Sequence, residues 1–326
     1  MTTFKEIRGT AIQVVSSDPS NPETGQIWYN SSSGTLKGYK TVNAWSSGGN
    51  LNTARGASAV AGTQTATIAA GGSAPSPNAA TELYNGTAWT TSPATLSTAK
   101  YAIGGFGTQT AAVAAGGVNA GYGLGSETWN GTTWTAATTQ NTPRAFMASA
   151  GTQTAGLTFG GYTGTANSAA TENYNGSSWT SVNSMNTGRY SLGGTGSGSP
   201  QTSALGFGGY IVPSPGNQSA TESWNGTSWT NVNSLNTARY GVGGAGASNI
   251  SAIAFGGSTP TTTGATELWN GTSWTTSPTS LATARNQSVG SGNATSGLAV
   301  GGNIGASGST ATEEWNSVAV QTVTVS

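Results

Sequence analysis

The sequence predicts an all-β protein: a six-bladed β-propeller with four-stranded antiparallel blades. A ten-residue phrase, TESWNGTSWT at 221–230, recurs along the chain with small changes, and short apolar runs between glycines separate its copies. The glutamates of these copies follow one another at intervals of 45, 45, 50, 45 and 46 residues. A period in the forties is typical of a chain that forms one propeller blade per repeat.

The composition favours a folded, strand-rich chain and excludes several classes of function. The 326 residues include 51 Gly, 11 Trp and 10 Tyr, and only 6% are charged, whereas disordered chains have few aromatics and high net charge. The net charge is zero and no basic patch stands out, so we expect no nucleic-acid partner. Cysteine is absent, which excludes disulfides and thiol chemistry.

We expect three regions along the chain: an N-terminal attachment segment at 1–36, the propeller at 37–316 and a C-terminal strand at 317–326. The N-terminus lacks the apolar core of a signal peptide, and no apolar run is long enough to span a membrane. We therefore expect synthesis in a cytoplasm and no membrane insertion. The C-terminal SVAVQTVTVS alternates like a half-buried strand, and it pairs either with the N-terminal segment or with another subunit.

Four features recur in fixed order: a basic residue, a Gly-Gly pair, a glutamate and a tryptophan. The charged positions are Arg55, Lys100, Arg144, Arg189, Arg239 and Arg285, with Glu82, Glu127, Glu172, Glu222, Glu267 and Glu313. Trp45 precedes Arg55 by 10 residues, in register with the other tryptophans, whereas the last repeat has no tryptophan in register. We therefore expect the strand around Trp45 to complete the last blade and close the ring, which removes an exposed sheet edge.

Side chains grow in size from the first strand of each repeat to the fourth. The segment after the basic residue is small, as in YSLGGTG at 190–196, the second strand is intermediate, the third carries Tyr or Trp and the fourth Trp. Small residues suit inner strands that crowd together. Large aromatics fill the space where blades diverge, and burying one contributes about 1.5–3 kcal/mol.

An Asn-Gly pair joins the third and fourth strands of five repeats. It predicts a tight type I′ hairpin turn, which requires positive φ at both central residues. The same residues also form Asn-x-Ser/Thr acceptors for N-glycosylation at Asn85, Asn130, Asn175, Asn225 and Asn270. We favour turn chemistry because the motif stays in register with the hairpin.

The succession LNTAR, IAFGG, TELWNG and SW resembles the kelch repeat, over residues 37–316. The chain departs from usual kelch repeats in having Asn-Gly where an Asp-Pro-like turn is common. The stretch DPSNPETGQIWYNSSSGTLKGYKTVNAW at 18–45 is similar to a segment of bacteriophage tail-fibre and other virion proteins. This second resemblance implies a place in the virion, other virion proteins as partners of the N-terminal segment, and an oligomeric state on the particle.

The residue types exclude most catalytic chemistry. Histidine is absent and Asp18 is the only aspartate, so a Ser-His-Asp site and zinc or copper ligation are excluded. The repeated charges could be paired carboxylates of a glycoside hydrolase, but their even spacing favours one structural ion pair per blade. The run GTGSGSP at 194–200 lacks the Gly-Lys-Ser/Thr of a phosphate-binding loop. We expect no enzyme activity and no cofactor.

The loops after each Gly-Gly pair vary, and they are the candidate contact surface. The longest, YIVPSPGNQSA at 210–220, carries Tyr210 and Ile211, and equivalent loops carry Tyr122 and Tyr162. Exposed aromatics among polar loop residues suit contacts with carbohydrate or protein. The alternative is that these tyrosines fold over the rim and contact nothing.

These observations predict a bacteriophage virion structural protein: a tail fibre, an appendage or a capsid-surface decoration. It would display a β-propeller and contact a host-surface glycan or receptor. The alternative is a non-viral kelch-type interaction or lectin module. A propeller enzyme of the carbohydrate-active or oxidase kind is disfavoured by the missing His and Cys and the near absence of Asp.

Overall fold

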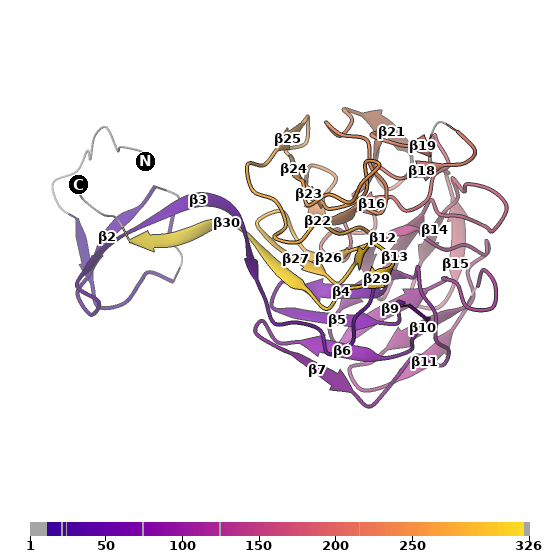
Figure 1. The fold of residues 1–326 in the computed structure, drawn as a ribbon, viewed down its shortest axis with the longest axis horizontal. Helices are drawn as coiled ribbons and strands as arrows, with labels where there is room; N and C mark the ends of the chain where they lie inside the picture. Colours follow the sequence, from indigo (N-terminus) through magenta and orange to yellow (C-terminus); the bar gives the residue numbers. More distant parts are fainter. Residues whose placement is uncertain are drawn as a thin grey trace. The chain divides into compact units, whose positions relative to one another are not determined.

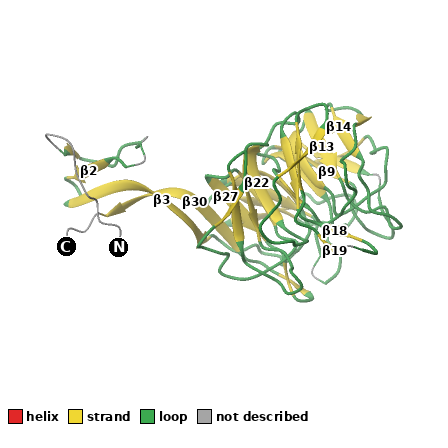
Figure 2. Ribbon diagram, turned by 90° about the horizontal axis from the view of Figure 1, so that it is seen from above, coloured by secondary structure: helices red, strands yellow, loops and turns green. Residues whose placement is uncertain are grey.

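The computed structural model describes residues 12–20, 22–23, 25–73, 75–123, 125–214 and 216–322, without the side chains of 40, 41 and 318–322. None of these residues is helical, and most strands belong to four-stranded antiparallel sheets. The predicted all-β class is therefore confirmed, and the architecture is β-propeller-like (Figures 1 and 2). Residues 1–11 of the predicted attachment segment and 323–326 of the predicted C-terminal strand lie outside the described residues.

The chain divides into two compact units. Unit 1 comprises Met1–Ala44 and Asn316–Ser326, and unit 2 comprises Trp45–Trp315. These bounds differ from the three predicted regions because two long strands, β3 (Thr35–Ser47) and β30 (Thr312–Thr322), run without a break across the predicted limits at 36/37 and 316/317.

The first three sheets of unit 2 follow chain order. The first contains β4 (Ala59–Thr63), β5 (Ala66–Ala70), β6 (Thr81–Tyr84) and β7 (Trp89–Ser92). The second contains β8 (Gly104–Thr108), β9 (Ala111–Ala115), β10 (Ser126–Trp129) and β11 (Trp134–Ala137). The third contains β12 (Ala148–Thr152), β13 (Ala155–Phe159), β14 (Thr171–Tyr174) and β15 (Trp179–Val182).

The fourth and fifth sheets repeat the same plan with one added ribbon. The fourth contains β16 (Gly193–Gly194), β17 (Ala204–Phe207), β20 (Thr221–Trp224) and β21 (Trp229–Val232). A two-stranded ribbon, β18 (Tyr210–Ile211) with β19 (Gly216–Asn217), occupies the loop between β17 and β20. The fifth contains β22 (Gly243–Ser248), β23 (Ser251–Phe255), β24 (Thr266–Trp269) and β25 (Trp274–Thr276).

The sixth sheet combines both ends of the chain. Its order in unit 2 is β26 (Val289–Gly292), β27 (Ser296–Val300), β30 and then β3, which carries Trp45 at the outer position. The ribbon β28 (Asn303–Ile304) with β29 (Ser307–Gly308) lies in the loop between β27 and β30. This strand order matches the prediction that the strand around Trp45 is the outer strand of the last repeat.

The innermost strands of the six sheets are β4, β8, β12, β16, β22 and β26, and each contacts the innermost strands of two neighbouring sheets. Contacts join β4 with β8, β8 with β12, β12 with β16, β16 with β22, β22 with β26, and β26 with β4. Figure 1 shows outer strands such as β7, β15 and β25 at the periphery of unit 2. The approach is close enough to require glycine, since a Cβ on Gly290 would lie 2.1 Å from the Gly244 carbonyl oxygen.

Six backbone hydrogen bonds join neighbouring sheets at the points where the chain enters the innermost strands. The residues stand two positions after each basic residue, and all have positive φ: Ala57, Ala102, Phe146, Ser191, Gly241 and Gln287. The amide of each donates to the carbonyl oxygen of the equivalent residue in the preceding sheet, at 2.7–3.0 Å, and Ala57 donates to Gln287. Positive φ is unfavourable for residues other than glycine, so these bonds offset a local cost.

Aromatic side chains fill the space between neighbouring sheets. Trp229 packs on Phe159 of the preceding sheet with ring centroids 4.8 Å apart, and Trp45 packs on Phe255 at 5.0 Å. The indole nitrogen of Trp45 donates to Thr266 Oγ1 at 2.9 Å, as that of Trp229 does to Thr171. Each tryptophan thus contributes apolar burial and one satisfied polar group to the joint between two sheets.

The Asn-Gly turns differ from the predicted type I′ geometry. Tyr84 pairs with Trp89, so the loop has four residues, and only Gly86 in it has positive φ, at 90°. The Asn85 side-chain oxygen instead accepts hydrogen bonds from the amides of Thr87 and Ala88 at 3.0 and 2.9 Å. The prediction of positive φ at both residues was wrong, because the asparagine side chain stabilises an Asx-type turn.

The run at 194–200, rejected above as a phosphate loop, has a structural place. Residues 195–199, here called the central segment, leave the short β16 and lie among the innermost strands of other sheets. Gly196 N donates to Ser149 O at 3.1 Å, and Ser197 Oγ bonds the backbone of Gly62 at 3.0 Å. A Cβ on Gly198 would lie 2.1 Å from Gly292 O and 2.6 Å from Gly246 O. The segment therefore touches the first, third, fifth and sixth sheets.

Unit 1 is a small sheet in which β1 (Gln13–Val15) lies parallel to β2 (Ile27–Asn30), β2 is antiparallel to β3, and β3 pairs with β30. Trp28 is fully buried, and its indole donates to Asp18 at 2.9 Å. Asn30 donates to the same carboxylate at 2.8 Å. These two bonds, with Lys37 nearby, hold the pKa of Asp18 below its ordinary value. The chain's single aspartate thus connects the segment that follows β1 to β2.

Candidate ligand-binding face

Seven aromatic side chains form one continuous row on unit 2, here called the tyrosine row: Tyr101, Tyr122, Phe146, Tyr162, Tyr190, Tyr210 and Tyr240. Tyr190 is its hub, with ring centroids 5.1 Å from Tyr162, 5.7 Å from Tyr210 and 6.1 Å from Phe146. Tyr240 extends the row from Tyr210 at 5.3 Å. Tyr122 contacts Tyr162 at 5.7 Å, and Tyr101 contacts Phe146 at 6.0 Å. All seven side chains are half-buried.

Five of the seven residues of the row occupy backbone positions that exist in every sheet but are aromatic in only some. In each sheet the residue after the basic residue forms a β-bridge with the residue after the Gly-Gly pair. The bridges of the second to fifth sheets contain Tyr101, Tyr162, both Tyr190 and Tyr210, and Tyr240. The first and sixth sheets have Gly56 with Ser73 and Asn286 with Asn303. The fold accepts small or polar residues here, so it does not require tyrosine.

The tyrosines of the row carry six hydroxyl groups. Among the described residues, no hydrogen bond joins the hydroxyl of any of the six tyrosines to another protein group. Burial, followed by the neighbouring tyrosines, of which Tyr210 contributes most, raises the pKa of Tyr190. Burial, with Tyr101 and Tyr162, also raises that of Tyr122. The row therefore offers neutral phenols as donors and acceptors.

A depression of about 820 Å³ opens at one end of the row. It is lined by three tyrosines and three neighbours: Tyr190, Tyr210, Tyr240, Val212, Asn217 and Pro260. Small-molecule sites commonly enclose about 300–1,000 Å³. A second, narrower cavity of about 100 Å³ lies between the innermost strands, with Gly196 of the central segment in its lining.

The structure brings together three of the four contact residues expected from sequence. Tyr122, Tyr162 and Tyr210 belong to the tyrosine row, whereas Ile211 pairs with Gly216 in the β18–β19 ribbon and does not line the depression. Sequence reasoning missed Tyr101, Phe146, Tyr190 and Tyr240. The signal was present, because tyrosine directly follows the basic residue in three repeats and glycine, alanine or asparagine does so in the others.

The repeated charges lie apart from this row, in six ion pairs inside the sheets. The pairs are Arg55–Glu82, Lys100–Glu127, Arg144–Glu172, Arg189–Glu222, Arg239–Glu267 and Arg285–Glu313. The five arginine side chains are fully buried, and the Lys100 side chain is 10% exposed. Their separations run from 2.5 to 3.2 Å.

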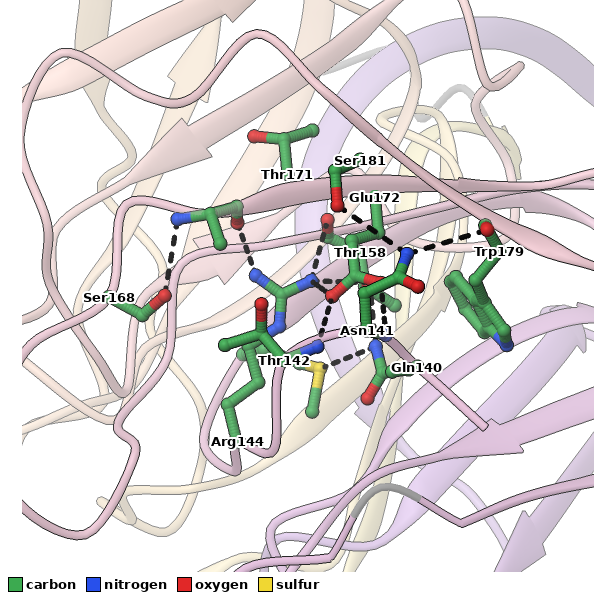
Figure 3. Close-up of polar contacts among 12 residues, drawn as sticks. Gln140, Asn141, Thr142, Arg144, Thr158, Ser168, Thr171, Glu172, Trp179 and Ser181 are labelled. Atoms are coloured by element: carbon green, nitrogen blue, oxygen red, sulfur yellow. Dashed lines mark hydrogen bonds and ion pairs between the residues drawn. The ribbon is translucent and has the colours of Figure 1, made fainter. Parts of the chain in front are cut away.

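Each glutamate also holds the linker that arrives from the preceding sheet. Figure 3 shows the third sheet, where Glu172 accepts from the amides of Asn141 and Thr142 at 2.7 and 3.2 Å as well as from Arg144. Arg144 also donates to Thr158 Oγ1 at 2.9 Å. Burial lowers the pKa of Arg144 to about 10, and Glu172 opposes that shift. With its acceptor capacity used this way, the carboxylate is poorly placed for acid–base chemistry on a ligand.

Metal and membrane signals are absent from the described part of the chain. No group of three or more His, Cys, Asp or Glu residues lies close enough to hold a metal ion there. Within the same residues, no helix has the length and apolar character needed to cross a bilayer.

No protein-family model matches the chain, and no curated protein matches it significantly.

Proposed function

We propose that the six sheets are the blades of one closed, six-bladed, kelch-like β-propeller that presents the tyrosine row as a binding face. Support for closure comes from the hydrogen bonds at the inner strands, which start at Ala57, pass through every sheet and return to Ala57 from Gln287. The indole of Trp89 adds a second link between the first and sixth sheets, since it donates to Thr312 at 2.9 Å.

The protein is a non-catalytic display protein, and the asymmetry of the tyrosine row carries this conclusion. Twelve of the thirteen charged side chains after Lys40 are used in ion pairs at equivalent places, which supports a scaffold role for the repeated charges. Tyrosines, by contrast, occupy four of six equivalent sheets without structural need. A row of half-buried rings, six of which carry a hydroxyl group, suits contact with a host-surface glycan or receptor.

The setting is a bacteriophage virion, as a tail fibre, appendage or capsid-surface decoration present in several copies. This rests on the resemblance of residues 18–45 to virion proteins. Unit 1 also exposes apolar side chains, with Val14 66% and Tyr29 39% exposed, and these two residues are partners in the β1–β2 register. Exposed apolar patches mark protein contacts, so unit 1 is the side that attaches to other virion proteins.

The attachment is tested in particles assembled with the full chain. Quantitative mass spectrometry of purified virions should detect the protein, and Val14→Asp with Tyr29→Asp should reduce its copy number. Ile250→Asp, which changes a residue that is 63% exposed on unit 2, is the control and should leave incorporation unchanged. Absence of the wild-type protein from virions would refute the viral role.

The alternative is a non-viral kelch-type interaction or lectin module, and the same tyrosine row supports it. It predicts ligand binding by the full chain without any particle. Ligand binding combined with absence from virions would favour this reading.

A further inference from the structure

We infer that the depression beside Tyr190, Tyr210 and Tyr240 binds an uncharged sugar unit of a neutral glycan. This inference rests on the proposed function as a binding face and specifies the chemistry of its ligand. The depression is built by the fourth and fifth sheets. The fourth sheet and its β18–β19 ribbon supply Tyr190, Tyr210, Val212 and Asn217, and the fifth sheet supplies Tyr240 and Pro260.

The walls of the depression are held in place before any ligand arrives. The β18–β19 ribbon is fixed on one side by Asn167, whose side-chain amide donates to Val212 O at 2.8 Å. On the other side, Asn217 Nδ2 donates to Ser258 O at 3.4 Å. Tyr210 is wedged between Tyr190 and Tyr240 with ring planes inclined at 65° and 66°. A preformed site loses little conformational entropy on binding.

The chemistry of the lining suits sugar. Its aromatic rings offer flat apolar faces on which the C–H-rich side of a pyranose can stack. The hydroxyls of Tyr190, Tyr210 and Tyr240 have no partner among the described residues, and Asn217 Oδ1 accepts no hydrogen bond there. These groups can donate to and accept from sugar hydroxyls, which act in both ways as well.

The absence of available charge selects the class of sugar. After Lys40 the chain has thirteen charged residues, of which twelve form the six ion pairs. The remaining one, Glu314, accepts a hydrogen bond from Tyr84 at 2.6 Å. None of the thirteen lines the depression. A carboxylated, sulfated or phosphorylated sugar would therefore lose its hydration without gaining a cation, which is unfavourable.

A protein receptor fits these observations less well than a sugar. Stable protein interfaces bury about 800 Å² on each partner and centre on a filled hot spot. Here the site is a depression whose lining includes three tyrosines and Asn217, which suits a small polar ligand. If the ligand is a protein instead of a sugar, the test below should give no glycan binding at all, which overturns the proposal.

The test uses the full chain and a panel of neutral oligosaccharides together with their sialylated and sulfated counterparts. We expect binding to one or more neutral members, weaker or no binding to the charged counterparts, and a Kd that changes less than about twofold between 0.15 M and 1 M NaCl, because screening acts on charges. Tyr210→Ala and Tyr240→Ala should each weaken binding at least about tenfold.

Two further variants keep the result interpretable. Tyr240→Phe retains the ring and should cost about 2–12-fold, the equivalent of one hydrogen bond. Ile250→Ala changes a residue that is 63% exposed and does not line the depression, and it should bind like wild type. Near-ultraviolet circular dichroism should be comparable for all folded variants.

Failure here is separable from failure of the proposed function. A preference for charged glycans with strong salt dependence, unchanged binding by Tyr210→Ala, or no glycan binding at all would overturn the neutral-sugar site. A protein found in virions that binds no sugar would still be a display protein. A protein that binds neutral sugar but is missing from virions would keep this site and lose the viral role.

Discussion

The amide of Ala57 donates a hydrogen bond to the carbonyl oxygen of Gln287 at 3.0 Å and so joins the first sheet of unit 2 to the sixth. Both residues have positive φ, of 53° and 51°. Equivalent bonds link the four intervening sheets, so a local backbone geometry that is unfavourable in isolation is repeated wherever two innermost strands meet.

Whether a substitution to glycine stabilises or destabilises the protein should depend on whether the substituted residue has positive φ. Ala57→Gly relieves a left-handed conformation that costs an alanine about 1–2 kcal/mol. Ala59, in β4, is similarly buried. Ala59→Gly relieves no left-handed conformation and should cost about 0.5–1 kcal/mol, because glycine loses more conformational entropy than alanine on folding. We expect Ala57→Gly to be the more stable variant by at least about 1 kcal/mol in urea unfolding. Equal destabilisation by the two variants would contradict the strain argument.

Breaking an ion pair should be costly in proportion to its burial. Glu172→Gln leaves the fully buried Arg144 without its counter-charge, and we expect a loss of about 3–5 kcal/mol in urea unfolding. Glu127→Gln should lose less, because the Lys100 side chain is 10% exposed whereas that of Arg144 is fully buried. A larger loss for Glu127→Gln than for Glu172→Gln would show that burial of the cation does not determine the cost of breaking the pair.

The central segment should tolerate no side chain at Gly198. Gly198→Ala would place a Cβ 2.1 Å from Gly292 O, so backbone must shift and we expect a loss of about 1–3 kcal/mol. Gly121→Ala is the matched control, because a Cβ there meets nothing within 4 Å. Thermal unfolding of both variants measures the difference. A Gly198→Ala protein as stable as the control would place this segment elsewhere.

Stability should fall at alkaline pH, in part through Tyr84. Burial and the hydrogen bond to Glu314 raise the pKa of Tyr84 to about 12, from 10.0 for a free tyrosine. Because the folded-state pKa is the higher one, the contribution is fully present below about pH 10 and is lost as pH rises through about 12. Between about pH 9 and pH 11, Tyr84→Phe should therefore lose less stability than wild type, measured by urea midpoints. Identical pH dependence would exclude this role.

The repeat explains how much of the fold was accessible from sequence. Tryptophans in register and the size gradient depend on packing that is the same in every sheet, so the all-β class, the four-stranded sheets and the place of the Trp45 strand could be predicted. The turn geometry could not, because Asn85 has two ways to stabilise a loop and only the flanking pair Tyr84–Trp89 decides between them.

The asymmetric features were harder because each depends on contacts between repeats. The longest interval, from Glu172 to Glu222, contains both the central segment and the β18–β19 ribbon. Its length marked the fourth repeat as unusual, but nothing local shows that residues 195–199 lie among four other sheets. Likewise, Tyr190 and Tyr240 stand in otherwise small-residue segments, and their contact with Tyr210 arises only when adjacent sheets pack.

The repeats form a scaffold, and we propose that recognition occurs on the tyrosine row. The most direct measurement is isothermal titration of the neutral oligosaccharide panel against wild type, Tyr240→Ala and Ile250→Ala. Ile250 is exposed and lies beside the Asn-Gly turn at Gly271, away from the depression. Tyr240→Ala should lose binding, and Ile250→Ala should keep wild-type affinity. Equal affinity in Tyr240→Ala, or loss only in Ile250→Ala, would contradict the proposal.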